Sequence, residues 1–171
     1  MLKPHGIERK LDQDDIIVSK TNLKGHITYA NDVFLEIADY SLSDVLGQPH
    51  SLIRNGVMPR CIFQLLWERL QAGREIFAYV VNNTKNNDAY YWVLAHVTPS
   101  RDNKGNITSY HSNRRCPSEA AISTISVLYE KLLDEENRKS NRKDGQKAGY
   151  VLLQKILGEK GVDYDEFVQT I

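Results

Sequence analysis

Five side chains have the chemistry to bind a flat ligand that has a polar edge. Phe63 and Trp67 are four residues apart, so a helix would place both rings on one face, where they could stack on a planar ring system. The forked donors of Arg54 suit a phosphate or a carbonyl group. Asn31 and Asn82 could each offer an amide to the edge of such a ligand. Ordinary roles compete with these: core packing for the rings, solvent exposure for the arginine, and capping or strand-edge hydrogen bonds for the asparagines.

Two histidines raise the question of haem, and no catalytic pattern is present. His50 or His96 could serve as an axial ligand to haem iron, although a lone histidine in a globular domain is more often hydrogen-bonded or at the surface. Haem therefore stays an alternative. The sequence holds no Ser/His/Asp or Cys/His arrangement and no phosphate-binding loop, so we expect a protein that is not an enzyme.

Length and charge limit the classes of protein to consider. The chain has 171 residues, 41% of them hydrophobic, which suits one folded domain with an extension. Lys and Arg together number 22, as do Asp and Glu, so the net charge is zero and no nucleic-acid surface is predicted. Cys61 and Cys116 match no metal-ligand spacing and are too few for a disulfide scaffold.

The same features predict the compartment. The apolar runs are far shorter than a membrane span, and the polar segment from Met1 to Asp15 has no signal peptide. Two thiols without disulfide partners suit a reducing environment. We therefore expect a soluble cytoplasmic protein that does not insert into a membrane.

Residue patterning predicts an α+β domain with a small antiparallel sheet and short helices on one face. The segments expected to be strands are rich in β-branched and aromatic residues and cover 16–21, 27–29, 76–83, 89–98 and 107–116. The segments expected to be helices between them cover 31–38, 41–47 and 59–72.

The two ends of the chain are predicted to be helical. In the first fifteen residues Leu2, Ile7 and Leu11 could line one side of a short helix. Beyond Pro117, apolar residues at helical spacing predict helices, and a polar and basic stretch between them predicts a linker. The predicted helices cover 119–136, 147–159 and 164–168, and the predicted linker covers 137–146.

Several short motifs in this order resemble a PAS sensor domain, and within that superfamily the FAD-binding PAS domains of aerotaxis receptors. They are Thr28-Tyr29-Ala30-Asn31-Asp32, Gly47-Gln48-Pro49-His50, Met58-Pro59 followed by Phe63 and Trp67, Tyr91-Trp92-Val93 and Val97-Thr98-Pro99. The resemblance covers Ile16 to Cys116. It implies an N-terminal cap segment over 1–15, a PAS sensor domain over 16–116 and a C-terminal helical extension over 117–171.

The resemblance implies a five-stranded antiparallel sheet wrapped by short helices, with FAD in the cleft. The residues that match the family's positions around the flavin are Asn31, Arg54, Phe63, Trp67 and Asn82. Where the family carries Arg-His-Pro-Asp, this chain has Arg54-Asn55-Gly56-Val57, so the arginine is kept while the histidine and the acid are not.

The tail from Leu157 to Phe167 resembles that of small free-standing PAS proteins, which partner a separate membrane receptor. This resemblance implies a redox sensor for aerotaxis that signals to a membrane chemoreceptor or another signalling protein. We expect a homodimer whose C-terminal helices present the output surface. The alternative is a cofactor-free interaction module whose cleft is filled by its own aromatic side chains.

Overall fold

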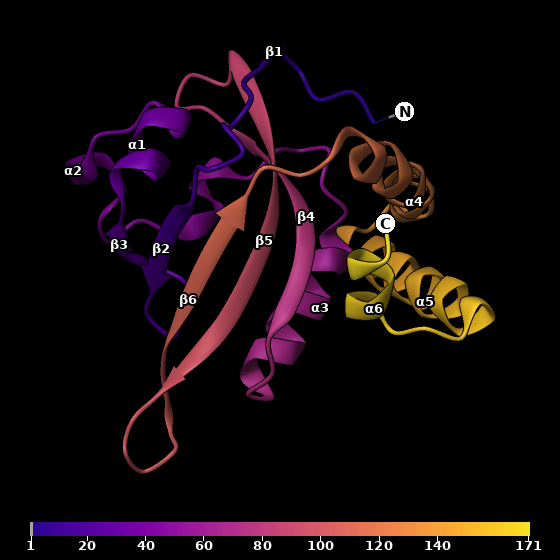
Figure 1. The fold of residues 1–171 in the computed structure, drawn as a ribbon. Helices are drawn as coiled ribbons and strands as arrows, with labels where there is room; N and C mark the ends of the chain where they lie inside the picture. The colour runs from indigo at the N-terminus through magenta and orange to yellow at the C-terminus, as the bar shows by residue number, and fades with distance from the viewer. Residues whose placement is uncertain (1) are drawn as a thin grey trace.

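The computed structural model describes residues 2–171, and an antiparallel sheet forms its central layer (Figure 1). The five strands that the sequence patterning predicted lie in the order β4, β5, β6, β2, β3. Their bounds are β2 Ile17–Thr21, β3 Ile27–Ala30, β4 Ile76–Asn83, β5 Ala89–Arg101 and β6 Ile107–Arg115. Helices cover one face, and the core between the two layers includes Phe34, Ile62 and Val93, which are fully buried.

The predicted N-terminal helix is wrong. The segment is extended instead, and Ile7–Glu8 forms a short strand, β1, that runs parallel to the start of β5. The N–H groups of Ile7 and Arg9 donate to carbonyls beside that strand, so the sheet supplies backbone hydrogen bonds that a helix would have made internally. Leu2 and Leu11 are buried as anchors while Ile7 is 76% exposed, so the three do not share one face.

Short helices on the inner face of the sheet bring residues from distant segments together. They are α1 Asp32–Ala38, α2 Leu42–Val45, the 3-10 helix η1 His50–Ile53 and α3 Arg60–Gln71. Asn31 caps α1 through its side chain, which accepts from Phe34 N, and Ser41 forms a capping box with Asp44 at the start of α2. The last helix, α3, begins after Pro59 and lies across the sheet.

The C-terminal helices pack beside β4 and α3 (Figure 1). They are α4 Glu119–Asn137, α5 Arg142–Lys160 and α6 Tyr164–Gln169. The predicted linker is shorter than expected, because Asn141 caps α5 by accepting from Lys143 N at 2.8 Å and the helix starts at Arg142. Within residues 2–171, no helix combines the length and the apolar composition that a membrane crossing requires.

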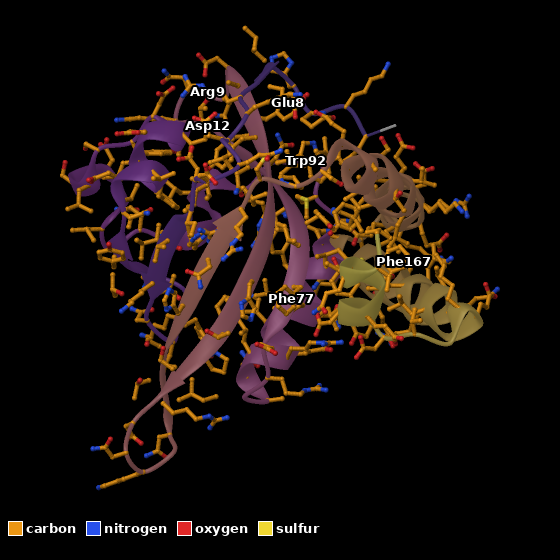
Figure 2. All side chains as sticks on the ribbon, in the orientation of Figure 1. Glu8, Arg9, Asp12, Phe77, Trp92 and Phe167 are labelled. Atoms are coloured by element: carbon orange, nitrogen blue, oxygen red, sulfur yellow. The ribbon has the colours of Figure 1, made fainter. Side chains whose placement is uncertain are left out.

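Hydrogen bonds connect β4 directly to these helices. The hydroxyl of Tyr129 on α4 donates to the carbonyl of Tyr79 at 2.7 Å, and the Asp165 carboxylate on α6 accepts from Phe77 N at 3.0 Å. Figure 2 marks the two sides of this junction, with Phe77 on β4 and Phe167 on α6. The strand that carries Asn82 on its inner face therefore meets the C-terminal helices along its free edge, which is the edge not paired with β5.

One buried carboxylate holds α4 on the first turn of α3. The side chain of Glu136 is 0% exposed, accepts from Cys61 N at 2.8 Å and from Arg60 N at 3.1 Å, and lies 3.0 Å from Arg60 Nε. Pro59 offers no side-chain cap, so Glu136 on α4 accepts from these N–H groups at the start of α3. A Cβ at Gly149 of α5 would lie 2.7 Å from Glu136 Cγ, so the glycine permits this close packing.

Candidate ligand-binding cavity

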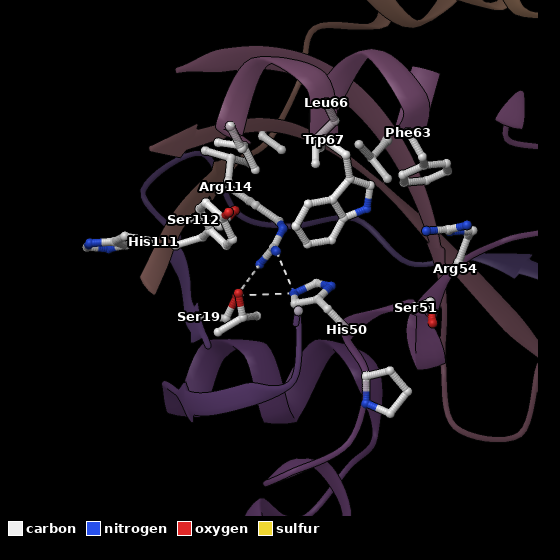
Figure 3. A pocket seen from close by; sticks show the side chains of 18 of the residues that line it. Ser19, His50, Ser51, Arg54, Phe63, Leu66, Trp67, His111, Ser112 and Arg114 are labelled. Atoms are coloured by element: carbon white, nitrogen blue, oxygen red, sulfur yellow. Dashed lines mark hydrogen bonds between the residues drawn. The ribbon is translucent and has the colours of Figure 1, made fainter. Parts of the chain in front are cut away.

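A cavity of about 310 Å³ lies between α3 and the inner face of the sheet (Figure 3). Four α3 residues line it: Phe63, Leu66, Trp67 and Leu70. They stand at i, i+3, i+4 and i+7, the spacing that places side chains on one face of a helix. This wall is therefore apolar and aromatic.

The opposite wall is made by alternate residues of four strands, which point to one face of a sheet. They are Ser19 and Thr21 on β2, Val80 and Asn82 on β4, Ala95 and Val97 on β5, and Tyr110, Ser112 and Arg114 on β6. The strand register sets Ala95 opposite Arg114 and Val97 opposite Ser112. The sheet wall is thus more polar than the helix wall.

Four of the five predicted ligand-binding residues line this cavity: Arg54, Phe63, Trp67 and Asn82. The guanidinium carbon of Arg54 lies 3.6 Å from the centre of the Phe63 ring, a cation–π contact. The Trp67 indole is half-buried and meets Tyr110 edge to face, with ring centres 5.6 Å apart. A Cβ at position 25 would lie 3.1 Å from this indole, so Gly25 gives the ring room beside the β2–β3 turn.

Asn31 does not line the cavity. Its amide oxygen accepts from Val18 N at 2.9 Å and from Phe34 N at 3.1 Å, and its amide nitrogen donates to Ile16 O at 2.8 Å. These three bonds tie the start of α1 to β2. The structure therefore places Asn31 apart from the other four residues, in the capping role that the sequence left open.

The segment that departs from the family pattern also lies outside the cavity lining. Asn55 is buried, and its side chain accepts from Val57 N at 3.0 Å and donates to Asn83. Its backbone N–H donates to Val81 O at 3.3 Å. The residues after Arg54 thus fasten this segment to the outer edge of β4.

The sequence analysis missed a buried cation in the sheet wall. Arg114 is 5% exposed; its Nη1 donates to Ser19 Oγ at 3.1 Å, and its Nη2 donates to His50 Nε2 at 2.7 Å. Ser19 Oγ and His50 Nε2 are 3.1 Å apart, so the three groups form a triangle (Figure 3). Burial, and after it the neighbouring Arg114, hold the pKa of His50 well below its usual range, so this ring is neutral and accepts.

Arg114 has no carboxylate partner among the ion pairs of residues 2–171. Burial lowers the pKa of its guanidinium to about 10, which still leaves the group charged at neutral pH. A buried charge is normally paired, so an uncompensated cation in a cavity favours a ligand with negative charge or carbonyl oxygens. One signal in the sequence could have identified Arg114 as a cavity residue. It is the alternation along the last strand, which places Tyr110, Ser112 and Arg114 on one face.

Four of the buried polar atoms that lack a hydrogen-bond partner in the described part of the chain belong to residues in or beside the cavity. They are Asn82 Nδ2, His111 Nε2 and Ser112 Oγ, whose residues line the cavity, and the hydroxyl of Tyr91. Tyr91 stands opposite Asn82 in the strand register. Buried polar groups are rarely left unpaired, so their grouping near Arg114 adds unused donors to this side of the cavity.

The two histidines considered for haem lie in different places. His50 lines the cavity, but its Nε2 is engaged by Arg114 and Ser19. His96 does not line it; its ring stacks on Phe77 at 4.1 Å between centres, and its Nε2 lies 2.7 Å from a carboxylate oxygen of Glu75. Residues 2–171 contain no group of three potential metal-ligating side chains.

Comparisons with known proteins agree with this architecture. The family model described as PAS domain matches residues 14–112, more than half of the chain. The aerotaxis receptor of Escherichia coli strain K12 is 34% identical over 122 residues, which are 71% of this chain and 24% of the receptor. A nitrogen fixation regulatory protein of Klebsiella pneumoniae is 28% identical over 105 residues, 61% of this chain and 21% of that protein. The chain thus spans about a quarter or less of these relatives.

Solved structures show the same fold. A light-oxygen-voltage domain studied with a flavin analogue superposes with a TM-score of 0.57 at 23% identity, over 72% of this chain and 88% of that chain. The dark-state LOV domain of Aureochrome1 gives the same score and identity over 68% and 85%. At this level of identity the likeness establishes the arrangement of the elements and nothing further.

Proposed function

This chain belongs to the PAS family of sensory signal-transduction domains, and we propose that it binds a flavin, as FAD, in the cavity between α3 and the sheet. The observation that carries the proposal is the buried guanidinium of Arg114, which has no carboxylate partner and points into a cavity with an aromatic wall. The similarity to an aerotaxis receptor supports a cytoplasmic redox sensor of the aerotaxis type.

The residues of the cavity fit a flavin ring system. Trp67 and Phe63 offer aromatic surface to a flat tricyclic ring. Arg114 and the amide nitrogen of Asn82 offer donors to an edge of carbonyl oxygens and ring nitrogens. A cavity of about 310 Å³ suits the ring system, so the nucleotide portion of FAD must lie outside it.

A bound flavin supplies a centre that takes up and releases electrons. The protein's own contribution is electrostatic, because a buried guanidinium favours whichever ligand state carries more negative charge. The amide of Asn82 can donate or accept, so it can re-form its hydrogen bonds when protonation at the ligand edge changes.

We further propose that β4 carries the signal to protein partners. Asn82 faces the cavity, while Tyr79 and Phe77 on the same strand hydrogen-bond to α4 and α6. A difference of about 1–3 kcal/mol between two ligand states suffices to shift a signalling equilibrium several-fold. The C-terminal helices would then present the altered surface to a homodimer partner or a membrane chemoreceptor.

Replacing Trp67 with leucine is expected to weaken FAD binding about tenfold or more, because a stacking surface is removed from the cavity wall. The stability of the FAD-free protein should change little, since the indole is half-buried beside the cavity. Titration of purified FAD-free protein, followed by flavin fluorescence, measures the affinity. Urea unfolding without flavin measures the stability.

Trp92→Leu provides the matched control, because Trp92 is buried at 6% exposure on the outer face of β5. This change should lower stability and leave the affinity of the remaining folded protein for FAD unchanged. A cofactor-free module predicts a different result: Trp67→Leu would then lower the stability of the FAD-free protein as a core substitution does, and no flavin would bind to either variant.

A further inference from the structure

One carboxylate at the start of α6 joins the two walls of the cavity. Asp165 Oδ1 accepts from Phe77 N at 3.0 Å, and Phe77 is the second residue of β4 in the sheet wall. The other carboxylate oxygen of Asp165, Oδ2, pairs with the guanidinium of Arg69 on α3, the helix that forms the opposite wall. A single side chain therefore bridges the helix and the sheet between which the cavity lies.

The α3 end of this bridge lies next to residues that line the cavity. Leu70 directly follows Arg69, Leu66 is one turn before it, and both line the cavity. The side chains of Arg69 and Asp165 are 11% and 18% exposed, so this ion pair is largely shielded from water and is stronger than a surface pair. Because α3 moves as one helix, a ligand that displaces its cavity face also displaces Arg69.

The helix α6 is short and packs beside β4 through buried side chains (Figure 1). It covers six residues, of which Tyr164 and Val168 are each 1% exposed. The Tyr164 hydroxyl lies 2.8 Å from that of Tyr129 on α4, and the Tyr79 hydroxyl donates to the Val168 carbonyl at 3.5 Å. A helix of this length is not stable without its packing partners, so α6 can detach locally while the sheet stays folded.

We propose that Asp165 is a positioning residue for the ligand: it holds α3 and β4 at the separation that the ligand needs, and α6 docks more tightly when the cavity is filled. The proposal rests on the flavin function proposed above. A ring system held between the walls fixes their distance, so the carboxylate reaches Arg69 and Phe77 N together. In the FAD-free protein the walls are freer to move relative to each other, so the bridge opens more often.

Thermodynamic linkage makes this coupling reciprocal. If the bridge favours bound flavin, bound flavin favours the bridge by the same factor. Flavin loading then changes how often α6 detaches and exposes Tyr164, Val168 and the edge of β4 that they cover. A protein partner would thus meet a different surface on a loaded chain than on an empty one.

The first test measures FAD affinity by titration of the full FAD-free chain. Asp165→Asn keeps an oxygen that can accept from Phe77 N but removes the charge that pairs with Arg69, so it breaks the bridge at its α3 end. Arg69→Gln breaks the same link from the other side. We expect each substitution to weaken FAD binding about fivefold or more, and the double variant to lose no more than either single variant, because the two residues act as a pair.

Hydrogen exchange gives a readout that a merely structural role would not move. In the wild type, saturating FAD should slow the exchange of the α6 amide hydrogens about fivefold or more, and in Asp165→Asn and Arg69→Gln it should change that exchange by less than about twofold. Glu166→Gln is the matched control, since Glu166 is the next residue on α6, is exposed, and loses the same charge. Its FAD affinity and its FAD-dependent exchange should match those of the wild type.

The outcomes separate this proposal from the flavin function on which it rests. If the wild type binds no FAD, the flavin function and the positioning role both fail. If the wild type binds FAD but α6 exchanges at the same rate with and without it, the flavin function survives and the positioning role is overturned. The same holds if Asp165→Asn and Arg69→Gln lower only the stability of the FAD-free chain and leave FAD affinity unchanged. An equal effect of Glu166→Gln would also overturn the positioning role, since general loss of charge would then explain the result.

Discussion

Replacing Arg114 with methionine is expected to lower flavin affinity about 100-fold while leaving the flavin-free protein at least as stable as the wild type. The affinity falls because the substitution removes a charged donor from a buried site, a change that costs about 2–5 kcal/mol. Stability is kept because the guanidinium lacks a carboxylate partner, and methionine of similar length carries no charge to desolvate. Ser19 and His50 remain bonded to each other.

Flavin titration and urea unfolding of the same FAD-free samples measure the two quantities. Arg115→Met is the control, because Arg115 is the next residue on β6, is exposed, and points to the other face of the sheet. This control should change neither the flavin affinity nor the free energy of unfolding. If Arg114→Met instead lowered the free energy of unfolding by several kcal/mol and left flavin affinity intact, Arg114 would be a structural residue and would not bind the flavin.

Replacing Glu136 with alanine is expected to destabilise the protein by about 3–5 kcal/mol. Removing one member of a buried ion pair leaves the other charge without a partner, and here it also leaves the N–H groups of Arg60 and Cys61 without an acceptor. The substitution therefore weakens the contact between α4 and α3. In the Glu136→Ala variant we therefore also expect the amide hydrogens of α4 and α5 to exchange faster than those of the sheet.

Urea unfolding and hydrogen exchange of the variants test this expectation. Glu135→Ala is the control, because Glu135 is partly exposed and, among residues 2–171, pairs only with Arg138 one turn away, a surface contact worth at most about 1 kcal/mol. A loss for Glu136→Ala no larger than for Glu135→Ala would mean that the buried carboxylate does not hold the two helices together.

Residue patterning was sufficient to predict the sheet and α3, and together with the family resemblance it identified four of the residues that line the cavity. The spacing of Phe63 and Trp67 defines a helix face, and alternation along β4 places Asn82 on the inner face of the sheet. Asn31 was ambiguous, because an amide beside a helix start suits both a ligand and a cap.

The rest of the site depends on contacts between distant segments. Arg114, His50 and Ser19 come from three separate elements, and only the folded sheet brings them together. Glu136 likewise reaches α3 from 75 and 76 residues away along the chain. The N-terminal prediction was wrong because apolar residues at roughly helical spacing can also serve as separate anchors when a strand edge takes the backbone hydrogen bonds.

The absorption spectrum of the purified full chain, before and after denaturation, tests the central claim most directly. The account predicts the bands of an oxidised flavin, FAD recovered in the supernatant at about one per chain, and loss of those bands on chemical reduction. A colourless protein that takes up no added flavin, or a spectrum with haem bands, would contradict it.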